Sequence, residues 1–263
     1  MTKDNQQLAR SGSFVHDLLV VAKRAIRLAL REPESIIPGI IVPLFFFIVN
    51  VGALSDISNF AGVEDYKAFQ LPVAIVFAVT GISRASSLVT DIQSGYFDRL
   101  LVSPVNRTAL LLGLMIADFL VVVALSIPVI VLGLSLGVNF VTGPLGILGF
   151  ILIAAAWGLA FTGFPYAIAL KTGNPGAVNS SFLLFFPFAF LTTSFLPQEA
   201  LTGWLANVAT YNPVTYILDG LRSITSNGWI WNDIWPALVA IGGMALFSQL
   251  LAFRALSGRT QQK

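Results

Sequence analysis

Residues 119–170, FLVVVALSIPVIVLGLSLGVNFVTGPLGILGFILIAAAWGLAFTGFPYAIAL, decide the fold, because this stretch holds no charged side chain. The apolar sequence extends back to Thr108, with Asp118 as its only charge. At about 1.5 Å per residue, a helix of this length is far longer than the bilayer core, which is about 30 Å thick. The chain must therefore turn once, and 137–144, GVNFVTGP, supplies the Gly, Asn and Pro that favour a turn. We predict two membrane spans, 109–136 and 145–170.

The chain as a whole is strongly apolar. Of its 263 residues 56% are hydrophobic and 11% are charged, whereas a typical soluble domain has about 25% charged residues. Uncharged runs that are apolar on every face predict helices, and about 20 such residues cross a bilayer. The run 68–83 is too short for this, so its span must continue past Arg84. The sequence thus predicts an all-α integral membrane protein with six transmembrane helices, the other four being 36–54, 69–90, 177–196 and 234–253.

Residues 1–35 are predicted to be a cytoplasmic tail followed by an amphipathic interfacial helix. Its apolar residues recur every three or four positions with Lys and Arg between them, and they are Phe14, Leu18, Val21, Ala25 and Leu28. The six spans then form one permease domain over 36–253, and 254–263 form a second cytoplasmic tail. Of the 15 Lys and Arg residues, 12 fall on the side of both termini and two on the other. The positive-inside rule therefore places both termini in the cytoplasm.

The segment 197–233 is too long for a tight turn and too apolar for an ordinary loop. We predict a re-entrant helical segment between the fifth and sixth spans, broken at Asn212-Pro213 because proline disfavours helix in the residue before it. Opposite charges three residues apart, as in Asp219 and Arg222, can pair on a helix. The residues expected to shape an exit are Trp204, Asn212, Pro213, Tyr216, Asp219 and Arg222. The alternative is an amphipathic helix that lies flat at the lipid headgroups.

The residue types present remove most catalytic chemistry. The chain has no Cys, and its single His, His16, precedes every predicted span, so thiolate sites and a Ser-His pair inside the membrane are excluded. No catalytic residue and no metal site is predicted. The sequence also lacks a G-x-x-x-x-G-K-[ST] phosphate loop for ATP. A net charge of +2 gives no reason to expect nucleic acid as a partner.

Two charges and a row of aromatic residues lie inside the predicted spans. Arg84 and Asp118 differ in depth by roughly one helical turn, so they can form an ion pair. Alternatively, the arginine reaches the headgroups and the aspartate bonds to hydroxyl groups.

The Phe-rich fifth span either lines a path for a hydrophobic substrate or faces lipid and neighbouring helices. Its candidate lining residues are Phe182, Phe185, Phe186 and Thr193.

The stretch 91–107, DIQSGYFDRLLVSPVNR, mixes charged, aromatic and aliphatic residues between two predicted spans. Such a mixture is typical of a short interfacial helix that meets a soluble partner, and equally of a solvated loop. The composition of the stretch leaves both interpretations open.

Two motifs carry a resemblance to a known family. The first is Gly95…Leu100-Leu101-Val102-Ser103-Pro104-Val105…Arg107, and the second is Leu196-Pro197…Trp204-Leu205…Asn212-Pro213-Val214-Thr215-Tyr216…Asp219…Leu221-Arg222. Both resemble the membrane permease of type 2 ABC exporters, the class of daunorubicin-resistance permeases and of teichoic-acid and O-antigen exporters. The six-span layout extends the resemblance over nearly the whole chain. Asp91-Ile92-Gln93 departs from the family's pattern, in which many members carry a Glu-Arg-Glu-like run.

The resemblance implies a permease that carries a lipophilic or amphipathic substrate, such as a drug, lipid or glycolipid, out of the cytoplasm or inner leaflet. It implies a second permease copy, identical or related, and a separate ATP-binding subunit that holds ATP and Mg, so that this chain binds no cofactor directly. The expected location, among membrane lipids, is the inner (plasma) membrane of a bacterium. The residues implied to seat a coupling helix on the ATPase are Asp91, Gly95, Tyr96, Phe97, Asp98, Arg99 and Leu100.

Two other functions compete with export. An ATP-independent secondary transporter or channel usually carries more ionisable groups at mid-membrane than this chain does. A membrane-embedded enzyme is the weaker alternative, since the predicted spans hold neither His nor clustered carboxylates.

Overall fold

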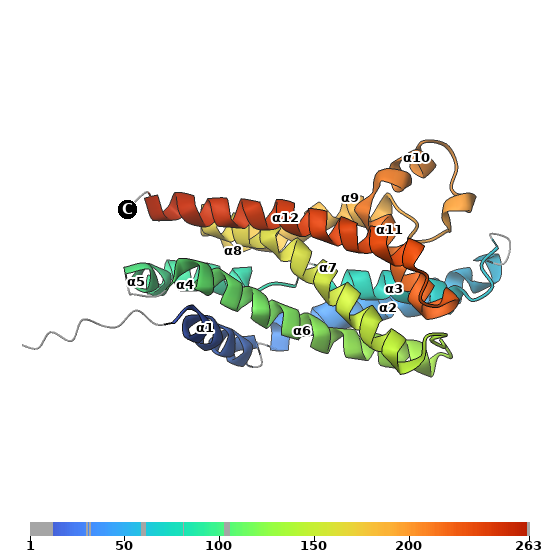
Figure 1. Cartoon of the computed structure of the whole chain (residues 1–263), viewed down its shortest axis with the longest axis horizontal. Coiled ribbons are helices and arrows are strands. Elements are labelled where there is room, and N and C mark those ends of the chain that lie inside the picture. Colours follow the sequence, from blue (N-terminus) through green and yellow to red (C-terminus); the bar gives the residue numbers. More distant parts are fainter. Residues whose placement is uncertain are drawn as a thin grey trace, which may run out of the picture.

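The computed structural model describes residues 13–29, 31, 33–58, 62–80, 82–102 and 106–261. Over these residues the chain forms helices and no strand, which confirms the all-α prediction. The α-helices in Figure 1 are α1 (Phe14–Ala29), α2 (Pro33–Ser58), α3 (Tyr66–Val79), α4 (Ala85–Gln93), α5 (Tyr96–Val102), α6 (Arg107–Ser135), α7 (Gly143–Thr172), α8 (Pro175–Ser180), α9 (Phe185–Phe190), α10 (Gly203–Tyr211), α11 (Pro213–Arg222) and α12 (Trp231–Gln261). The shorter elements are the 3-10 turns η2 (Ser181–Leu184) and η3 (Gln198–Ala200) and the π-helical turn η4 (Ser223–Asn227).

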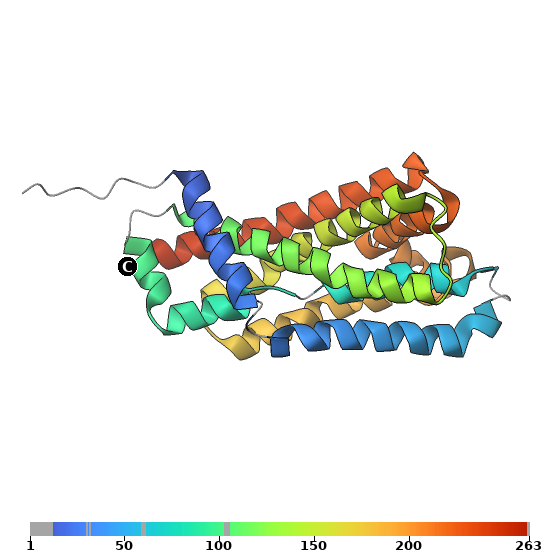
Figure 2. The same ribbon diagram turned by 90° about the horizontal axis from the view of Figure 1, so that it is seen from below.

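The long helices run side by side and give the molecule two distinct ends (Figures 1 and 2). One end, called here the α1 end, carries α1, α4, α5 and the C-terminus. The other, the α10 end, carries α10, α11, the N-terminus of α3 and the turn between α6 and α7. Helix α1 lies across the bundle rather than along it, as Figure 2 shows. This placement fits the interfacial helix that the sequence predicts.

Four helices are long and apolar enough to cross a membrane: Ile37–Ser55, Thr108–Ser135, Gly143–Thr172 and Trp231–Arg259. They match the predicted first and third spans to within one residue and contain the predicted fourth and sixth spans, and the predicted turn at 137–144 joins α6 to α7. The second and fifth predicted spans correspond to shorter apolar helical segments, Tyr66–Val79 and Pro175–Phe190. Most of the predicted tail 254–263 is helical, because α12 continues to Gln261.

The prediction of one continuous helix over 69–90 is wrong. Helix α3 ends at Val79, and α4 begins only at Ala85. Neighbouring helices supply hydrogen bonds to the break: Trp157 Nε1 of α7 donates to Thr80 Oγ1 at 2.8 Å, and Arg84 N donates to Asp118 Oδ1 of α6 at 2.8 Å. Interrupted helices are tolerated at membrane depth where protein satisfies the freed backbone groups. Arg84, which we expected inside a span, is buried at this break.

The predicted helix over 177–196 also ends early, at Phe190. The end is stabilised by Asn212, whose Nδ2 donates to the carbonyls of Phe188 at 2.8 Å and Leu191 at 2.7 Å. A helix leaves its last carbonyl groups without intrahelical partners, so a buried amide donor at this position permits the chain to turn. Residues 191–196 then run as bends toward η3.

Helix α1 packs closely on α6 because α6 has a glycine where the two helices meet. A Cβ at Gly113 would lie 2.8 Å from Val21 Cβ and 3.0 Å from the Leu18 carbonyl oxygen. The buried side of α1 carries small residues, Ala22, Ala25 and Ala29, while Lys23 and Arg27 are exposed. The amphipathic helix predicted within 1–35 is therefore confirmed, and residues 1–12 lie outside the described part of the chain.

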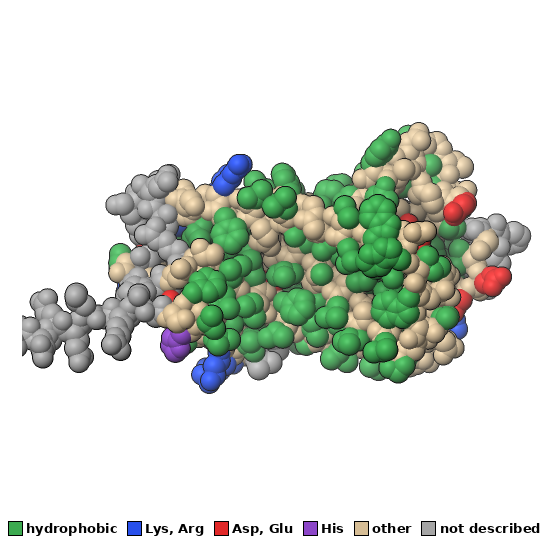
Figure 3. Space-filling model, in the orientation of Figure 1, with side chains coloured by type: hydrophobic (Ala, Val, Ile, Leu, Met, Phe, Trp, Pro, Cys, Tyr) green, Lys and Arg blue, Asp and Glu red, His purple; other side chains and the backbone are tan. Residues whose placement is uncertain are grey.

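The distribution of side chains along the bundle matches that of a membrane protein. On the face drawn in Figure 3, hydrophobic side chains cover the middle, with His and most of the visible Lys and Arg toward the α1 end and most of the visible acidic side chains at the α10 end. Exposed apolar residues across the mid-section are stable only in contact with lipid or another protein.

Candidate functional site

Helices α4 and α5 form a bent unit at the α1 end, called here the coupling elbow (residues 85–102). The bend lies at Ser94 and Gly95, and Gly95 has φ +69°, a left-handed conformation that favours glycine. The stretch 91–107 thus contains the short helix of our first interpretation, α5, rather than only a solvated loop.

Helix α1 contacts the coupling elbow through a bidentate ion pair. Arg24 Nη1 and Nη2 donate to Asp91 Oδ2 and Oδ1, both at 2.7 Å, and the guanidinium lies 4.4 Å from the centre of the Tyr96 ring. The hydrogen bonds to Asp91 raise the pKa of Arg24 above its ordinary value. Asp17 Oδ2 accepts a hydrogen bond from Asn106 N at 3.1 Å, just before α6 begins. Helix α1 therefore forms hydrogen bonds with the chain both before and after α5.

The predicted coupling residues divide into two groups. Asp91 and Tyr96 contact α1, and Phe97 is buried among apolar residues of α4 and α6. Arg99 is exposed, its Nε donating to Gly95 O at 3.5 Å, and Asp98 and Leu100 are partly buried. The exposed surface of the elbow also includes Gln93, Ser94 and Val102, which were not among the predicted coupling residues.

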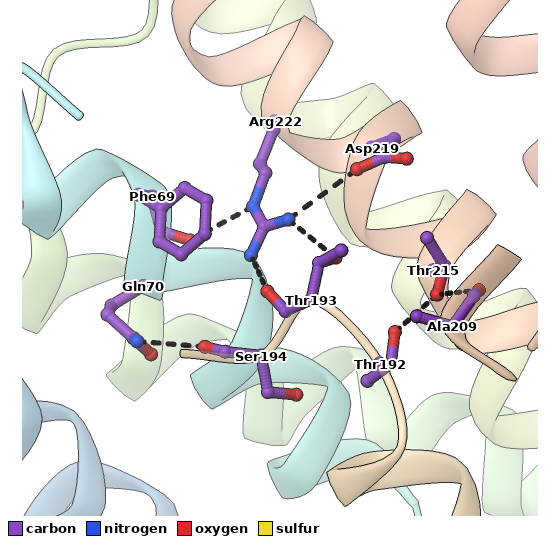
Figure 4. Close-up of polar contacts among 9 residues, drawn as sticks. All are labelled: Phe69, Gln70, Thr192, Thr193, Ser194, Ala209, Thr215, Asp219 and Arg222. Atoms are coloured by element: carbon purple, nitrogen blue, oxygen red, sulfur yellow. Dashed lines mark hydrogen bonds and ion pairs between the residues drawn. The ribbon is translucent and has the colours of Figure 1, made fainter. Parts of the chain in front are cut away.

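A second cluster, centred on Arg222, lies at the α10 end (Figure 4). The Arg222 side chain is 11% exposed, and Nη1 and Nη2 donate to Thr193 Oγ1 at 2.9 Å and Thr193 O at 2.6 Å. Its Nε donates to Phe69 O at 3.3 Å, and its guanidinium lies 3.6 Å from the Phe69 ring centre. The predicted ion pair with Asp219 is present at 3.5 Å. Arg222 thus joins α11 to α3 and to the bends after α9.

The predicted helix break at Asn212-Pro213 is confirmed. Asn212 ends α10 and begins α11, where its side chain accepts a hydrogen bond from Val214 N at 3.0 Å, and Pro213 is the first residue of α11. Thr215 Oγ1 donates to Ala209 O at 2.7 Å and lies 2.6 Å from Thr192 Oγ1 (Figure 4). Side-chain hydrogen bonds therefore stabilise the break from both α10 and α11.

The two helices of this pair differ in their surroundings. Helix α11 packs on α12, α3 and α7, as expected of a segment sealed against the spans. Helix α10 instead leaves Trp204 68% and Tyr211 85% exposed, which is the pattern expected of a helix lying at the headgroups. Tyr216 lies between them, with its hydroxyl donating to Thr210 O at 2.6 Å. The re-entrant interpretation therefore fits α11, and the interpretation as a helix lying flat at the headgroups fits α10.

The candidate lining residues do not share one surface. Phe185 is fully buried against Phe77 and Phe161, and Thr193 is buried under Arg222. Phe182 is partly buried, whereas Phe186 is 38% exposed and stacks on Phe190. Only the exposed part of this row is accessible to a substrate or a second subunit.

Asp118 is fully buried and has a structural environment. Its Oδ1 accepts from Arg84 N, and its Oδ2 accepts from Tyr166 Oη at 2.6 Å. Arg84 and Asp118 are thus neighbours as predicted, and the contact seen is through the backbone of Arg84 at the start of α4. The described residues contain no group of three His, Asp or Glu side chains able to hold a metal ion.

Comparison with known proteins agrees with these features. The family model of the ABC-2 type transporter matches residues 16–225, which include most of α1, the coupling elbow and the Arg222 cluster. The daunorubicin resistance ABC transporter permease protein DrrB1 of Streptomyces coeruleorubidus is 27% identical over 235 residues, covering 86% of this chain and 81% of the relative.

Two further relatives are similar over comparable lengths. DrrC of Mycobacterium tuberculosis, named a probable doxorubicin resistance ABC transporter permease protein, is 23% identical over 89% of this chain and 85% of its own length. The ycf38 transport permease of Cyanophora paradoxa is 28% identical over 89% of this chain and 82% of its own length. The chain therefore belongs to the ABC-2 type transporter family, as a membrane permease of an ABC exporter.

Proposed function

We propose that this chain is driven by a separate ATP-binding subunit that docks on the coupling elbow, and that it exports a lipophilic or amphipathic compound. The observation that carries this proposal is the elbow itself: a bent helical unit with an exposed outer surface, fixed from behind by Arg24 and Asp17 of α1. A displacement of the elbow by the ATP-binding subunit would move α1 through the Arg24–Asp91 pair, and would move the long helix α6 through the contact of Asp17 with Asn106. ATP and Mg would reside on the partner, since this sequence has no phosphate loop.

A second permease copy would complete the transport path. Only 11% of the membrane-spanning stretch of α2 is buried within the chain, and Leu183, Phe186 and Phe190 are also exposed. Apolar area of this extent favours protein or lipid contacts. The names of the drug-resistance relatives support a lipophilic substrate such as a drug, lipid or glycolipid. The predicted lining residue Phe186 would face the path or the second copy.

We further propose six membrane crossings, with the α1 end in the cytoplasm of a bacterium. The crossings at α3–α4 and at α8–α9 would each use an interrupted helix, supported by Asp118 in the first case and Asn212 in the second. The α10 end would then lie outside, with α11 as the re-entrant segment and Trp204 of α10 at the headgroups.

This topology can be tested on the naturally Cys-free chain. We expect a membrane-impermeant maleimide, added to intact cells, to label Glu64→Cys and Trp204→Cys, whose native side chains are exposed at the α10 end. Gly258→Cys on α12, at the other end, should be labelled only after the membrane is opened. Labelling of position 258 in intact cells, or protection of position 64, would contradict the proposed orientation.

The export function itself can be tested by reconstitution. Tagged permease purified from its own host membranes should retain an ATP-binding subunit and hydrolyse Mg-ATP, and lipid vesicles that contain the complex should move a fluorescent amphiphile only when ATP is supplied. The chain purified without the partner should do neither. Movement of the amphiphile by the isolated chain without ATP would instead favour the secondary transporter or channel.

A further inference from the structure

A long apolar groove lies between α1, α6, α7 and α12, away from both candidate sites. It has a volume of about 560 Å³ and is lined by Phe14, Leu18, Leu112, Met115, Ile116, Phe119, Ala156, Leu159, Ala160, Ile241, Ala245 and Gln249. These four helices form the face drawn in Figure 3, which is covered by hydrophobic side chains. Every lining residue of α6, α7 and α12 belongs to a helix stretch able to span the membrane.

Gln249 is the polar residue of the groove, and half of its amide lacks a partner. Its Nε2 donates to Leu159 O at 3.1 Å. Its Oε1 is buried, and no donor among the described residues reaches it. A buried acceptor without a partner costs about 1–3 kcal/mol, so a ligand with a hydrogen-bond donor at this point would be favoured.

The position of the groove identifies the medium that fills it. Along α6 it extends from Leu112 to Phe119, about 10 Å at the rise of a helix, which is about a third of the bilayer core. Gln249 and the α1 residues lie at the end nearer the polar α1 end of the molecule. Hydrocarbon therefore surrounds the deep part of the groove, and a lipid headgroup region lies next to Gln249.

Charge at that end favours an anionic headgroup. Lys23 and Arg27 on α1 and Arg254 on α12 are exposed, and Arg254 lies five residues beyond Gln249, about 7.5 Å along the helix. Cationic side chains near the membrane surface each attract anionic lipid by about 1 kcal/mol. The required ligand combines an acyl chain, a negative phosphate and a hydroxyl donor.

We propose that the groove binds one phospholipid of phosphatidylglycerol chemistry from the leaflet at the α1 end. Its acyl chain occupies the groove, a headgroup hydroxyl donates to Gln249 Oε1, and its phosphate lies near the basic side chains. Phe14 and Leu18, which form one wall, belong to the helix whose Arg24 holds Asp91. A bound lipid therefore steadies the helix that supports the coupling elbow.

The test compares three lipids with identical chains on the full-length permease in detergent micelles, with retained lipid counted by native mass spectrometry. Phosphatidylglycerol is anionic and has hydroxyl donors, phosphatidylmethanol is anionic without a donor, and phosphatidylcholine has neither property. We expect phosphatidylglycerol to bind about fivefold more tightly than phosphatidylmethanol, as for one net hydrogen bond, and phosphatidylcholine to bind most weakly.

Three variants locate the binding site. Gln249→Leu should reduce the affinity for phosphatidylglycerol to that for phosphatidylmethanol, and leave the latter unchanged. Ala245→Trp should fill the groove and abolish the preference, whereas Leu246→Trp, at a neighbouring residue that is 66% exposed, should retain it. Equal binding of the three lipids by the native chain would overturn the proposal, as would equal retention by the two Trp variants. So would a dimer of the chain that closes this face to lipid.

Discussion

Replacing Arg222 with methionine should destabilise the permease by about 3 kcal/mol or more, seen as a lower midpoint of thermal unfolding in detergent. Arg222 donates to two oxygen atoms of Thr193 and to the Phe69 carbonyl. Hydrogen bonds that involve a charged group contribute about 1.5–3 kcal/mol each, and the guanidinium also stacks on the Phe69 ring. Methionine retains much of the volume but has no donor. Amide hydrogens of 191–196 and α11 should therefore exchange faster.

Two milder variants separate the hydrogen bonds from the charge. Arg222→Lys keeps a cation but loses the planar fork, so it should recover only part of the stability. Thr193→Val removes one acceptor, the hydroxyl bonded at 2.9 Å, and should cost about a third as much as Arg222→Met. Unchanged unfolding and unchanged exchange in Arg222→Met would show that the outer helices are held without this residue.

The sequence predicted those parts of the fold that depend on local composition. The uncharged stretch 119–170 and its Gly-Asn-Pro turn lead directly to α6 and α7, and the basic amphipathic pattern leads to α1. The helix break at Asn212-Pro213 and the pairing of Asp219 with Arg222 were also predictable, because both depend on residues close together in sequence.

The errors arise where distant residues replace hydrogen bonds within a helix. Hydropathy gave no reason to interrupt 69–90, because the interruption depends on Asp118 and Trp157, which come from other helices. The early end of the fifth segment depends likewise on Asn212, at least 21 residues further along the chain. An amide or carboxyl group in an apolar run is the sequence feature that could have indicated such a break.

The predicted coupling residues lie on the bent α4–α5 unit, but the sequence did not reveal the contacts that hold this unit in place. Arg24 and Asp17 lie 67 and 89 residues from their partners, and no local spacing reveals such contacts. The acidic residue at 91, where many family members carry a Glu-Arg-Glu-like run, was the available signal: a carboxylate beside a helix rich in arginine has a ready partner. The sequence likewise did not reveal that Phe185 and Thr193 are buried, since composition cannot distinguish a core residue from a lining one.

Reversing the charge of Asp91 should uncouple the proposed exporter. In Asp91→Arg, the guanidinium of Arg24 faces a second cation instead of the carboxylate that now binds it at 2.7 Å. The pair is partly exposed, so its hydrogen bonds and the stacking of Arg24 on Tyr96 together contribute about 1.5–2 kcal/mol. Since 1.4 kcal/mol is a factor of ten, we expect substrate stimulation of ATP hydrolysis in the reconstituted complex to fall at least tenfold.

The double charge exchange determines whether the ion pair itself carries this effect. Arg24→Asp alone should be as defective as Asp91→Arg, whereas the double variant restores opposite charges across α1 and the elbow and should regain part of the stimulation. Recovery should be incomplete, because Arg24 no longer stacks on Tyr96. Glu199→Arg, an equal charge reversal on an exposed residue at the α10 end, serves as the control and should leave stimulation unchanged. If the complex assembles normally and the double variant is no better than either single variant, then the elbow is supported by packing of α1 on α6 and not by this pair.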